Sequence, residues 1–155
     1  MLAGMGGPMS PNEAMEAVRG VYAELAAQPL ARACTGLADC CRFRLTGRTP
    51  YLTLGEGLVA AVAWRAAGRT AVLPTADGAC PFLGGSGRCQ IYGGRPFGCR
   101  THFCAAAGGP YPRPNVRPWI QRLEQIDHQL GGHGGVNLPS AVALAMTTVA
   151  RKFRN

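Results

Sequence analysis

Two groups of cysteines place the strongest constraint on how this chain can fold. The first runs from Cys34 to Cys41 as CTGLADCC, and the second runs from Cys80 to Cys104 and holds the other four of the seven cysteines. The second stretch is interrupted by glycine and proline and contains no acidic residue. Such segments form little regular structure. We therefore expect an additional constraint on them, and consider disulfides, a bound metal or cluster, and a reactive thiol.

Several features argue against disulfides. The first residues, MLAGMGGPMSPNEAMEAV, lack the basic and apolar regions of a secretory signal, and no run of about 18 apolar residues follows. We therefore expect a cytoplasmic protein without a membrane span, in a compartment that keeps thiols reduced. The odd number of cysteines and the adjacent pair Cys40 and Cys41 point the same way. A thiolate beside arginines can be a nucleophile, but seven clustered cysteines favour ligation first.

The pattern of apolar residues predicts helices before and between the cysteine groups. Ser10 followed by Pro11 is typical of a helix start, and apolar residues then recur at helical spacing, so we expect a helix over about 11–28. A second helix should begin at Thr53, where Glu56 completes a capping box, and Gly68 should end it.

Two further helices are expected after the second cysteine group. Pro118 should open a helix over about 118–130, and a helix over about 139–153 is apolar nearly all round. Only short extended pieces, 71–73 and 90–92, stand out between Arg69 and Asn115. The 155 residues therefore predict a mainly α fold with few short strands, as one small domain over 1–155. Its helices should pack around an irregular, metal- or cluster-bound loop core over 34–104.

The net charge of +8, from sixteen basic and eight acidic residues, suggests a nucleic-acid-binding module. Thiolates that bind a metal would offset much of this excess. Arg88, Arg95 and Arg100 lie inside the second cysteine group, where positive charge would compensate such thiolates. Nucleic acid is therefore a possible partner but not the favoured one.

The second cysteine group resembles a known family. It reads C-P-F-L from Cys80 and C-Q-I-Y-G-G-R-P-F-G-C-R from Cys89, and with CTGLADCC it is similar to the CxxCxxCC cysteine-cluster family, also called YkgJ-like. Leu37 stands at the second cysteine position of the first motif. The resemblance covers about residues 34–104, including Thr53 and Glu56, and implies a zinc- or iron-chelating or iron–sulfur protein. The flagellin lysine N-methylase shares the cysteine pattern.

The resemblance implies a set of metal ligands, and Cys104 is a further candidate outside the core pattern. The six cysteines at family positions, listed below, are more than the four ligands of a structural zinc or the four ligands of one [4Fe–4S] cluster. Some thiols are therefore spare, or the centre is polynuclear. Thiolate ligation and positive surroundings favour an iron–sulfur cluster, of the 4Fe–4S type, over zinc as the alternative. The family-position cysteines are Cys34, Cys40, Cys41, Cys80, Cys89 and Cys99.

Other side chains near the second group are weaker candidates. Tyr92, Arg95 and Arg100 are candidates for orienting the cluster or binding an anion, although packing and a turn explain Tyr92 and Arg95 equally. His102 is a possible ligand, whereas His128 and His133 suit a helix surface and a loop. The GGHGG run at 131–135 follows a helix rather than a strand, so it is not a nucleotide fingerprint.

Two classes of function remain open at this point. The first is a non-catalytic metal-binding protein with a structural, sensing or accessory role toward a protein partner or small-molecule substrate that the sequence does not identify. The second is an iron–sulfur enzyme, such as one with protein lysine methyltransferase-like activity. The small chain and the absence of a recognisable S-adenosylmethionine site favour the first class, and no catalytic residue is assigned.

Overall fold

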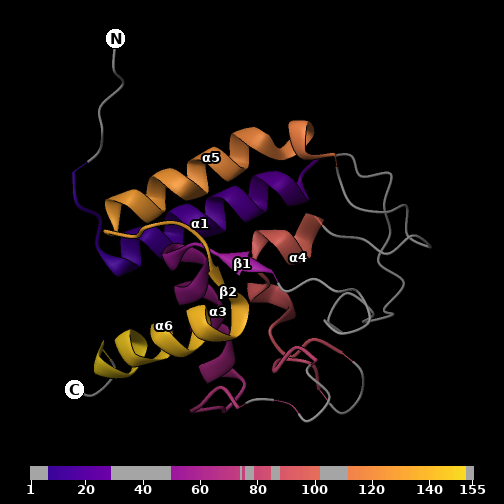
Figure 1. Cartoon of the computed structure of the whole chain (residues 1–155), viewed down its shortest axis with the longest axis vertical. Helices are drawn as coiled ribbons and strands as arrows, with labels where there is room; N and C mark the ends of the chain where they lie inside the picture. The colour runs from indigo at the N-terminus through magenta and orange to yellow at the C-terminus, as the bar shows by residue number, and fades with distance from the viewer. Residues whose placement is uncertain are drawn as a thin grey trace.

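The computed structural model describes residues 7–28, 50–73, 75, 79–84, 88–101 and 112–152 (Figure 1). This part of the chain is mainly helical, as the sequence predicted. Within these ranges, two very short strands and one 3-10 helix accompany the α-helices. In chain order the elements are α1 (Pro11–Ala26), β1 (Tyr51–Leu52), α3 (Leu54–Ala66), η2 (Tyr92–Gly94), α4 (Phe97–Thr101), α5 (Arg113–Gln129), β2 (Val136–Asn137) and α6 (Leu138–Lys152).

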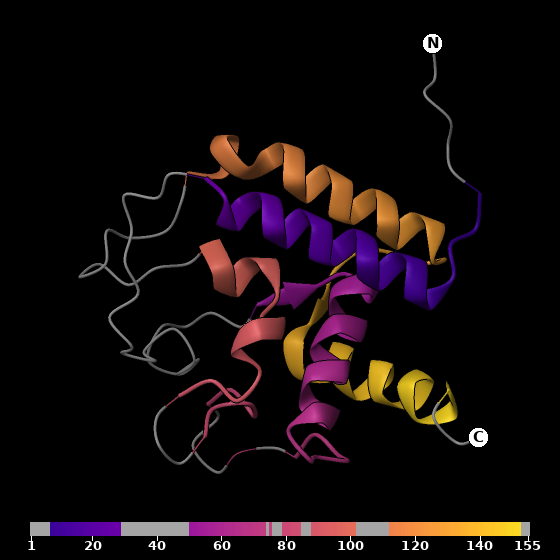
Figure 2. The same ribbon diagram turned by 180° about the vertical axis from the view of Figure 1, so that it is seen from behind.

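Helix α3 lies at the centre of the fold, with α1 and α5 on one side and α6 on another (Figure 2). Small residues allow the close packing. A Cβ atom at Gly55 would lie 2.8 Å from the Val18 side chain of α1, and one at Gly57 would lie 3.2 Å from the Ala141 carbonyl oxygen of α6. Such contacts bury nearly all of the first half of α3, so it is the structural axis on which other segments pack.

The two strands pair antiparallel, with Tyr51 opposite Asn137 and Leu52 opposite Val136. Strand β1 directly precedes α3, and β2 directly precedes α6. The Leu138 N–H also donates to the Pro50 carbonyl oxygen at 2.9 Å. This two-stranded ribbon of β1 and β2 therefore holds the starts of α3 and α6 side by side.

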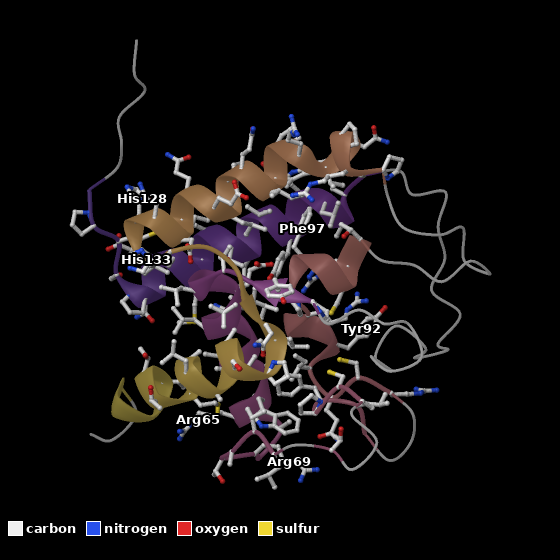
Figure 3. The ribbon with its side chains drawn as sticks, viewed as in Figure 1. Arg65, Arg69, Tyr92, Phe97, His128 and His133 are labelled. Atoms are coloured by element: carbon white, nitrogen blue, oxygen red, sulfur yellow. The ribbon has the colours of Figure 1, made fainter. Side chains whose placement is uncertain are left out.

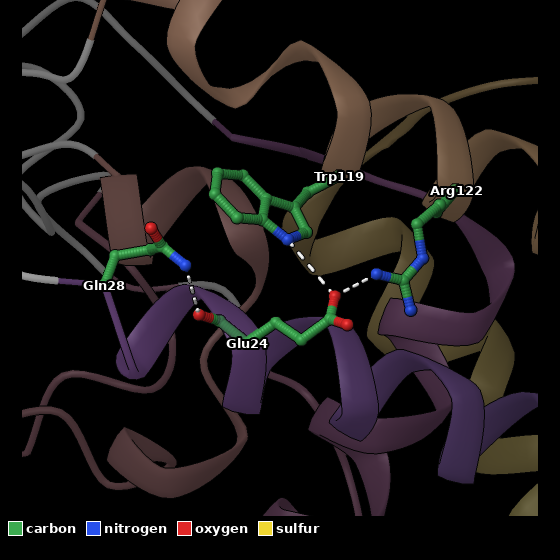
Figure 4. Close-up of polar contacts among 4 residues, drawn as sticks. All are labelled: Glu24, Gln28, Trp119 and Arg122. Atoms are coloured by element: carbon green, nitrogen blue, oxygen red, sulfur yellow. Dashed lines mark hydrogen bonds and ion pairs between the residues drawn. The ribbon is translucent and has the colours of Figure 1, made fainter.

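Helices α1 and α5 run antiparallel. The start of α1 therefore lies at the end of α5, where the Met9 N–H donates to the Gln129 carbonyl oxygen. At their outer edge the Glu24 carboxylate accepts hydrogen bonds from the Trp119 indole and the Arg122 guanidinium (Figure 4). The Glu24 and Arg122 side chains are about half exposed, so their ion pair contributes less than about 1 kcal/mol. Apolar side chains beneath them supply most of the stability of this helix pair.

Three of the four expected helices, α1, α3 and α6, have the predicted starts and stops within about two residues. Helix α1 begins at Pro11, with the Ser10 hydroxyl accepting from the Glu13 N–H. Helix α3 follows the Thr53 capping box, and Gly68 just beyond it has a φ of +83°. This left-handed conformation is one that glycine adopts without strain, which explains why the helix stops there.

The expected start of the third helix was wrong. Helix α5 begins at Arg113 rather than Pro118, because Pro114 occupies the first turn, where a missing N–H costs nothing. Pro118 lies inside the helix. Helix α6 starts one residue before the predicted position and is not buried all round, since Leu144 is 55% exposed.

The expected extended pieces were also wrong. Residues 71–73 form no strand. Gln90 and Ile91 form a turn that leads into η2, where the Gly94 N–H donates back to the Ile91 carbonyl oxygen at 2.8 Å. Among the described helices, none combines the length and the apolar character that a membrane span requires.

Candidate metal centre

Cys80 and Cys89 lie in one short hairpin. Leu83 forms an antiparallel bridge with Cys89, the Gln90 N–H donates to the Phe82 carbonyl oxygen at 2.8 Å, and the Gly84 N–H donates to the Arg88 carbonyl oxygen at 2.8 Å. Cys80 is buried and Cys89 is half-buried. Local pairing therefore holds two cysteines that are nine positions apart in the sequence on one small structural unit.

Cys99 lies on α4, directly after a loop that its neighbour Arg100 stabilises. The Arg100 guanidinium donates to the Arg95 carbonyl oxygen at 2.7 Å and to the Gly93 carbonyl oxygen at 2.8 Å. The Cys99 N–H donates to the Pro96 carbonyl oxygen at 3.0 Å. These bonds tie α4 back onto η2, the element that follows Cys89 in the chain.

Both cysteine-bearing segments, the hairpin and α4, are anchored to α3, and so is η2 between them. The buried Phe82 of the hairpin packs edge to face on Trp64, with ring centroids 4.8 Å apart. Gly94 of η2 packs so closely on α3 that an added Cβ would lie 2.7 Å from the Ala63 Cβ. The Phe97 N–H, at the start of α4, donates to the Glu56 carboxylate at 2.8 Å. The hairpin, η2 and α4 thus contact the end, middle and start of one helix.

The Glu56 carboxylate is the polar centre of this arrangement. It is only 3% exposed. Its Oε1 accepts from the Phe97 N–H and from the Tyr22 hydroxyl at 3.2 Å, and its Oε2 accepts from both the N–H and the hydroxyl of Thr53 at 3.0 Å. One side chain therefore joins α1, the start of α3 and the start of α4.

Burial changes the acid–base properties of these groups. Removal from water raises the pKa of Glu56, while its hydrogen bonds to Thr53, Phe97 and Tyr22 oppose that rise. Burial and the Glu56 carboxylate raise the pKa of Tyr22 well above its ordinary value. Burial lowers the pKa of Arg100, against the influence of Tyr22 and Cys99. Arginine stays protonated at neutral pH, so Arg100 keeps a positive charge beside Cys99.

The other two residues proposed for cofactor binding make local contacts. The Arg95 guanidinium stacks over the Tyr92 ring at 3.6 Å from its centroid, and its Nε donates to the Tyr92 carbonyl oxygen at 2.9 Å. Tyr92 is 53% exposed. Arg100 stacks instead over the Tyr22 ring, at 4.0 Å. The structure thus places Tyr92, Arg95 and Arg100 around η2 and α4.

Three of the seven predicted ligands lie in the described part of the chain. None of the three, Cys80, Cys89 and Cys99, forms a disulfide. Across the described ranges, no three His, Cys, Asp or Glu side chains form a group that could hold a metal ion. These three thiols alone therefore do not complete a site. The predictions for Cys34, Cys40, Cys41, Cys104 and His102 lie outside the described residues.

The remaining histidines lie elsewhere. His128 is exposed on α5 and His133 is exposed in the turn after it, as expected from the sequence. Figure 3 shows both on the opposite side of the molecule from Tyr92 of η2. Neither is placed to complete a site with the cysteines of the hairpin or α4.

A cavity of about 820 Å³ lies between α4, β1 and α5. Phe97, Gly98 and Thr101 of α4 contribute to its lining, together with β1 and α5. Figure 3 shows the labelled Phe97 pointing into the interior beside α5. The cavity contains acidic, basic and apolar groups, so its lining does not select one class of ligand.

Local sequence patterns do not indicate the roles of Tyr22 and Glu56. Tyr22 fits the apolar stripe of α1, and Glu56 fits a capping box, so neither pattern indicated a buried hydrogen bond between α1 and α3. Phe82 and Phe97 carried no signal beyond their place in the family motif. Contacts between helices distant in the sequence created these roles.

These features define a class of protein in which a helical scaffold holds cysteine-bearing loops. A family model named CxxCxxCC, described as "Putative zinc- or iron-chelating domain", matches residues 33–122. This is more than half of the chain, which therefore belongs to that family and shares its association with zinc or iron binding. Searches of the curated proteins and of the solved structures each returned no match.

Proposed function

We propose that this chain is a non-catalytic protein that binds a 4Fe–4S type iron–sulfur cluster, with a structural, sensing or accessory role. The residues around 34–104 would form the cluster-binding core of a single domain. Thiolates from both cysteine groups would serve as ligands. The proposed ligands are Cys34, Cys40, Cys41, Cys80, Cys89 and Cys99, with Cys104 as a further candidate.

The observation that carries this proposal is the common anchoring to α3 of the two cysteine-bearing elements, the hairpin and α4, together with η2, which connects them. Phe82, Gly94 and Phe97 attach the hairpin, η2 and α4 to one helix. Their thiols stay out of disulfides. Cysteines outside disulfides are available for ligation, because the thiolate is the form that binds metals.

The surroundings of the thiols favour a cluster over zinc. Arg100 is positively charged and lies beside Cys99, and Arg95 lies in the connection between η2 and α4, where its carbonyl oxygen accepts from Arg100. A thiolate-held cluster carries net negative charge, which such groups stabilise, and hydrogen bonds near its sulfurs tune its potential. When bound, the cluster would supply one-electron redox chemistry. The chain's own part is to hold the thiols, compensate their charge and limit their exposure to water.

Metal and sulfide analysis of protein purified without exposure to air tests the proposal. We expect a brown protein that contains iron and acid-labile sulfide in comparable amounts. The Cys99→Ser variant should lose most of both, whereas Ser86→Ala, a change between Cys80 and Cys89 that removes no thiol, should retain them. A colourless protein with stoichiometric zinc would establish the zinc alternative. A protein that holds neither metal would overturn metal binding altogether.

A further inference from the structure

We propose that Glu56 is a positioning residue of the metal centre, acting on Cys99 through its hydrogen bond to the start of α4. The inference rests on the proposed function, since it concerns the placement of one of the proposed ligands. Glu56 does not contact the thiol. Its carboxylate instead holds the Phe97 N–H, two residues before Cys99, at 2.8 Å.

The hydrogen bonds of Glu56 require a carboxylate rather than an amide. Each oxygen accepts one backbone N–H, from Phe97 at Oε1 and from Thr53 at Oε2. A glutamine has one carbonyl oxygen and one NH₂ group, so in this geometry its NH₂ would face one of the two N–H donors. A buried N–H without an acceptor is destabilising, and the chain can relieve this only by moving Thr53 or Phe97. The two-oxygen acceptor thus sets the distance between the starts of α3 and α4.

A second connection fixes α4 from the side of α1. The Tyr22 hydroxyl donates to the same Oε1 atom that holds Phe97, and the Tyr22 ring lies under the Arg100 guanidinium at 4.0 Å. Residues on both sides of Cys99 are therefore held by one connected set of side chains: Phe97 through Glu56, and Arg100 through Tyr22. This set leaves α4 little freedom to shift relative to α1 and α3.

The contacts of Glu56 and Tyr22 with α4 affect the geometry of the metal centre as well as the stability of the fold. Metal–thiolate bonds need sulfur atoms placed to within a few tenths of an ångström. Groups that orient metal ligands typically change metal affinity about 10- to 100-fold when they are replaced. Loss of the Glu56 acceptor should therefore alter how Cys99 binds, even in molecules that remain folded.

The test compares full-length variants purified without air. Glu56→Gln removes one acceptor, and Tyr22→Phe removes only the hydroxyl and leaves the ring beneath Arg100. Glu16→Gln and Tyr51→Phe are matched controls, because both side chains are exposed on the surface. We would measure iron and sulfide per chain, the absorption spectrum per bound iron, and the rate of iron release to a chelator. Circular dichroism would verify that each variant is folded.

We expect Glu56→Gln to release iron at least about 10-fold faster than wild type. Tyr22→Phe should release it severalfold faster, and both variants should have an altered spectrum per bound iron. A purely structural role would lower the stability but leave that spectrum unchanged. Should wild type hold iron while folded Glu56 and Tyr22 variants match the controls in spectrum and release rate, the positioning role is wrong and the proposed function stands. Should wild type hold no metal, both are wrong.

Discussion

The Phe82 ring meets the Trp64 indole edge to face, with centroids 4.8 Å apart and planes inclined by 78°. Phe82 belongs to the hairpin that carries Cys80 and Cys89, and Trp64 lies near the end of α3. The indole is fixed in turn by its N–H, which donates to the Ala71 carbonyl oxygen at 2.9 Å. This pair is an apolar connection between the hairpin and the helical scaffold.

Replacing Phe82 should therefore destabilise the protein and loosen the hairpin. Phe82 is fully buried, so we expect Phe82→Ala to lower the free energy of unfolding by about 3 to 5 kcal/mol. Leu73→Ala is the control, because Leu73 is 70% exposed and should cost much less. Urea unfolding of the protein as purified measures both. Equal effects of the two substitutions would contradict the anchoring role of Phe82.

The adjacent glycines of η2 offer a matched pair of substitutions. A Cβ at Gly94 would lie 2.7 Å from the Ala63 Cβ and 3.2 Å from the Val59 carbonyl oxygen, whereas a Cβ at Gly93 meets nothing within 4 Å. Gly94→Ala should push η2 away from α3, at a cost of about 1 to 3 kcal/mol, and reduce the iron content. Gly93→Ala should be close to neutral. Denaturant unfolding and metal analysis would show whether the two variants differ as expected.

Tyr22 should make the stability depend on pH in alkaline solution. Burial and Glu56 of α3 raise its pKa in the folded protein, and Arg100 of α4 opposes them. The unfolded chain loses this proton near about pH 10, so above that pH the folded state binds more protons and stability falls as pH rises.

The measurement is urea unfolding between about pH 8 and pH 11. Wild type should lose stability more steeply than Tyr22→Phe above about pH 10. Tyr51→Phe, which alters a 68% exposed tyrosine, should follow wild type. Parallel curves for wild type and Tyr22→Phe would show that the Tyr22 proton makes no such contribution.

Asp127 should support the fold without affecting the metal centre. This carboxylate is 4% exposed and accepts from the Leu54 N–H at 2.8 Å and the Gly134 N–H at 3.0 Å. Asp127→Asn leaves one of these donors without an acceptor, and we expect a loss of about 1 to 3 kcal/mol in unfolding free energy. Iron content should stay at the wild-type level, because neither donor, Leu54 at the first position of α3 or Gly134 in the turn after α5, lies in an element that carries a cysteine. A loss of iron in the folded variant would contradict this separation.

The helices could be predicted from the sequence wherever local chemistry decides them. Ser10 and Thr53 mark their helix starts through their own side chains, and Gly68 marks a stop through its φ of +83°. Pro118 misled the prediction because Pro114 has the same preference for a first turn and lies earlier in the chain. Local rules do not decide between two equivalent starts.

Features that depend on contacts between distant residues were not predictable from the sequence. The ribbon joins Tyr51 to Asn137 across most of the chain, and two-residue strands leave no periodic pattern. The GGHGG run had no assigned role, yet Gly132 packs against the Asp127 carboxylate, where any Cβ would collide with it. Glu56 looked like a helix cap alone because its partners Tyr22 and Phe97 are 34 and 41 positions away.

X-ray absorption at the iron edge of air-free, full-length protein tests the central claim most directly. Thiolate ligation of an iron–sulfur cluster predicts a first shell of sulfur atoms at about 2.3 Å, a distance typical of metal–thiolate bonds, and a further shell of iron. The Cys99→Ser variant should lose this signal or replace one sulfur by oxygen. A first shell of nitrogen or oxygen, or a protein without bound iron, would contradict the account.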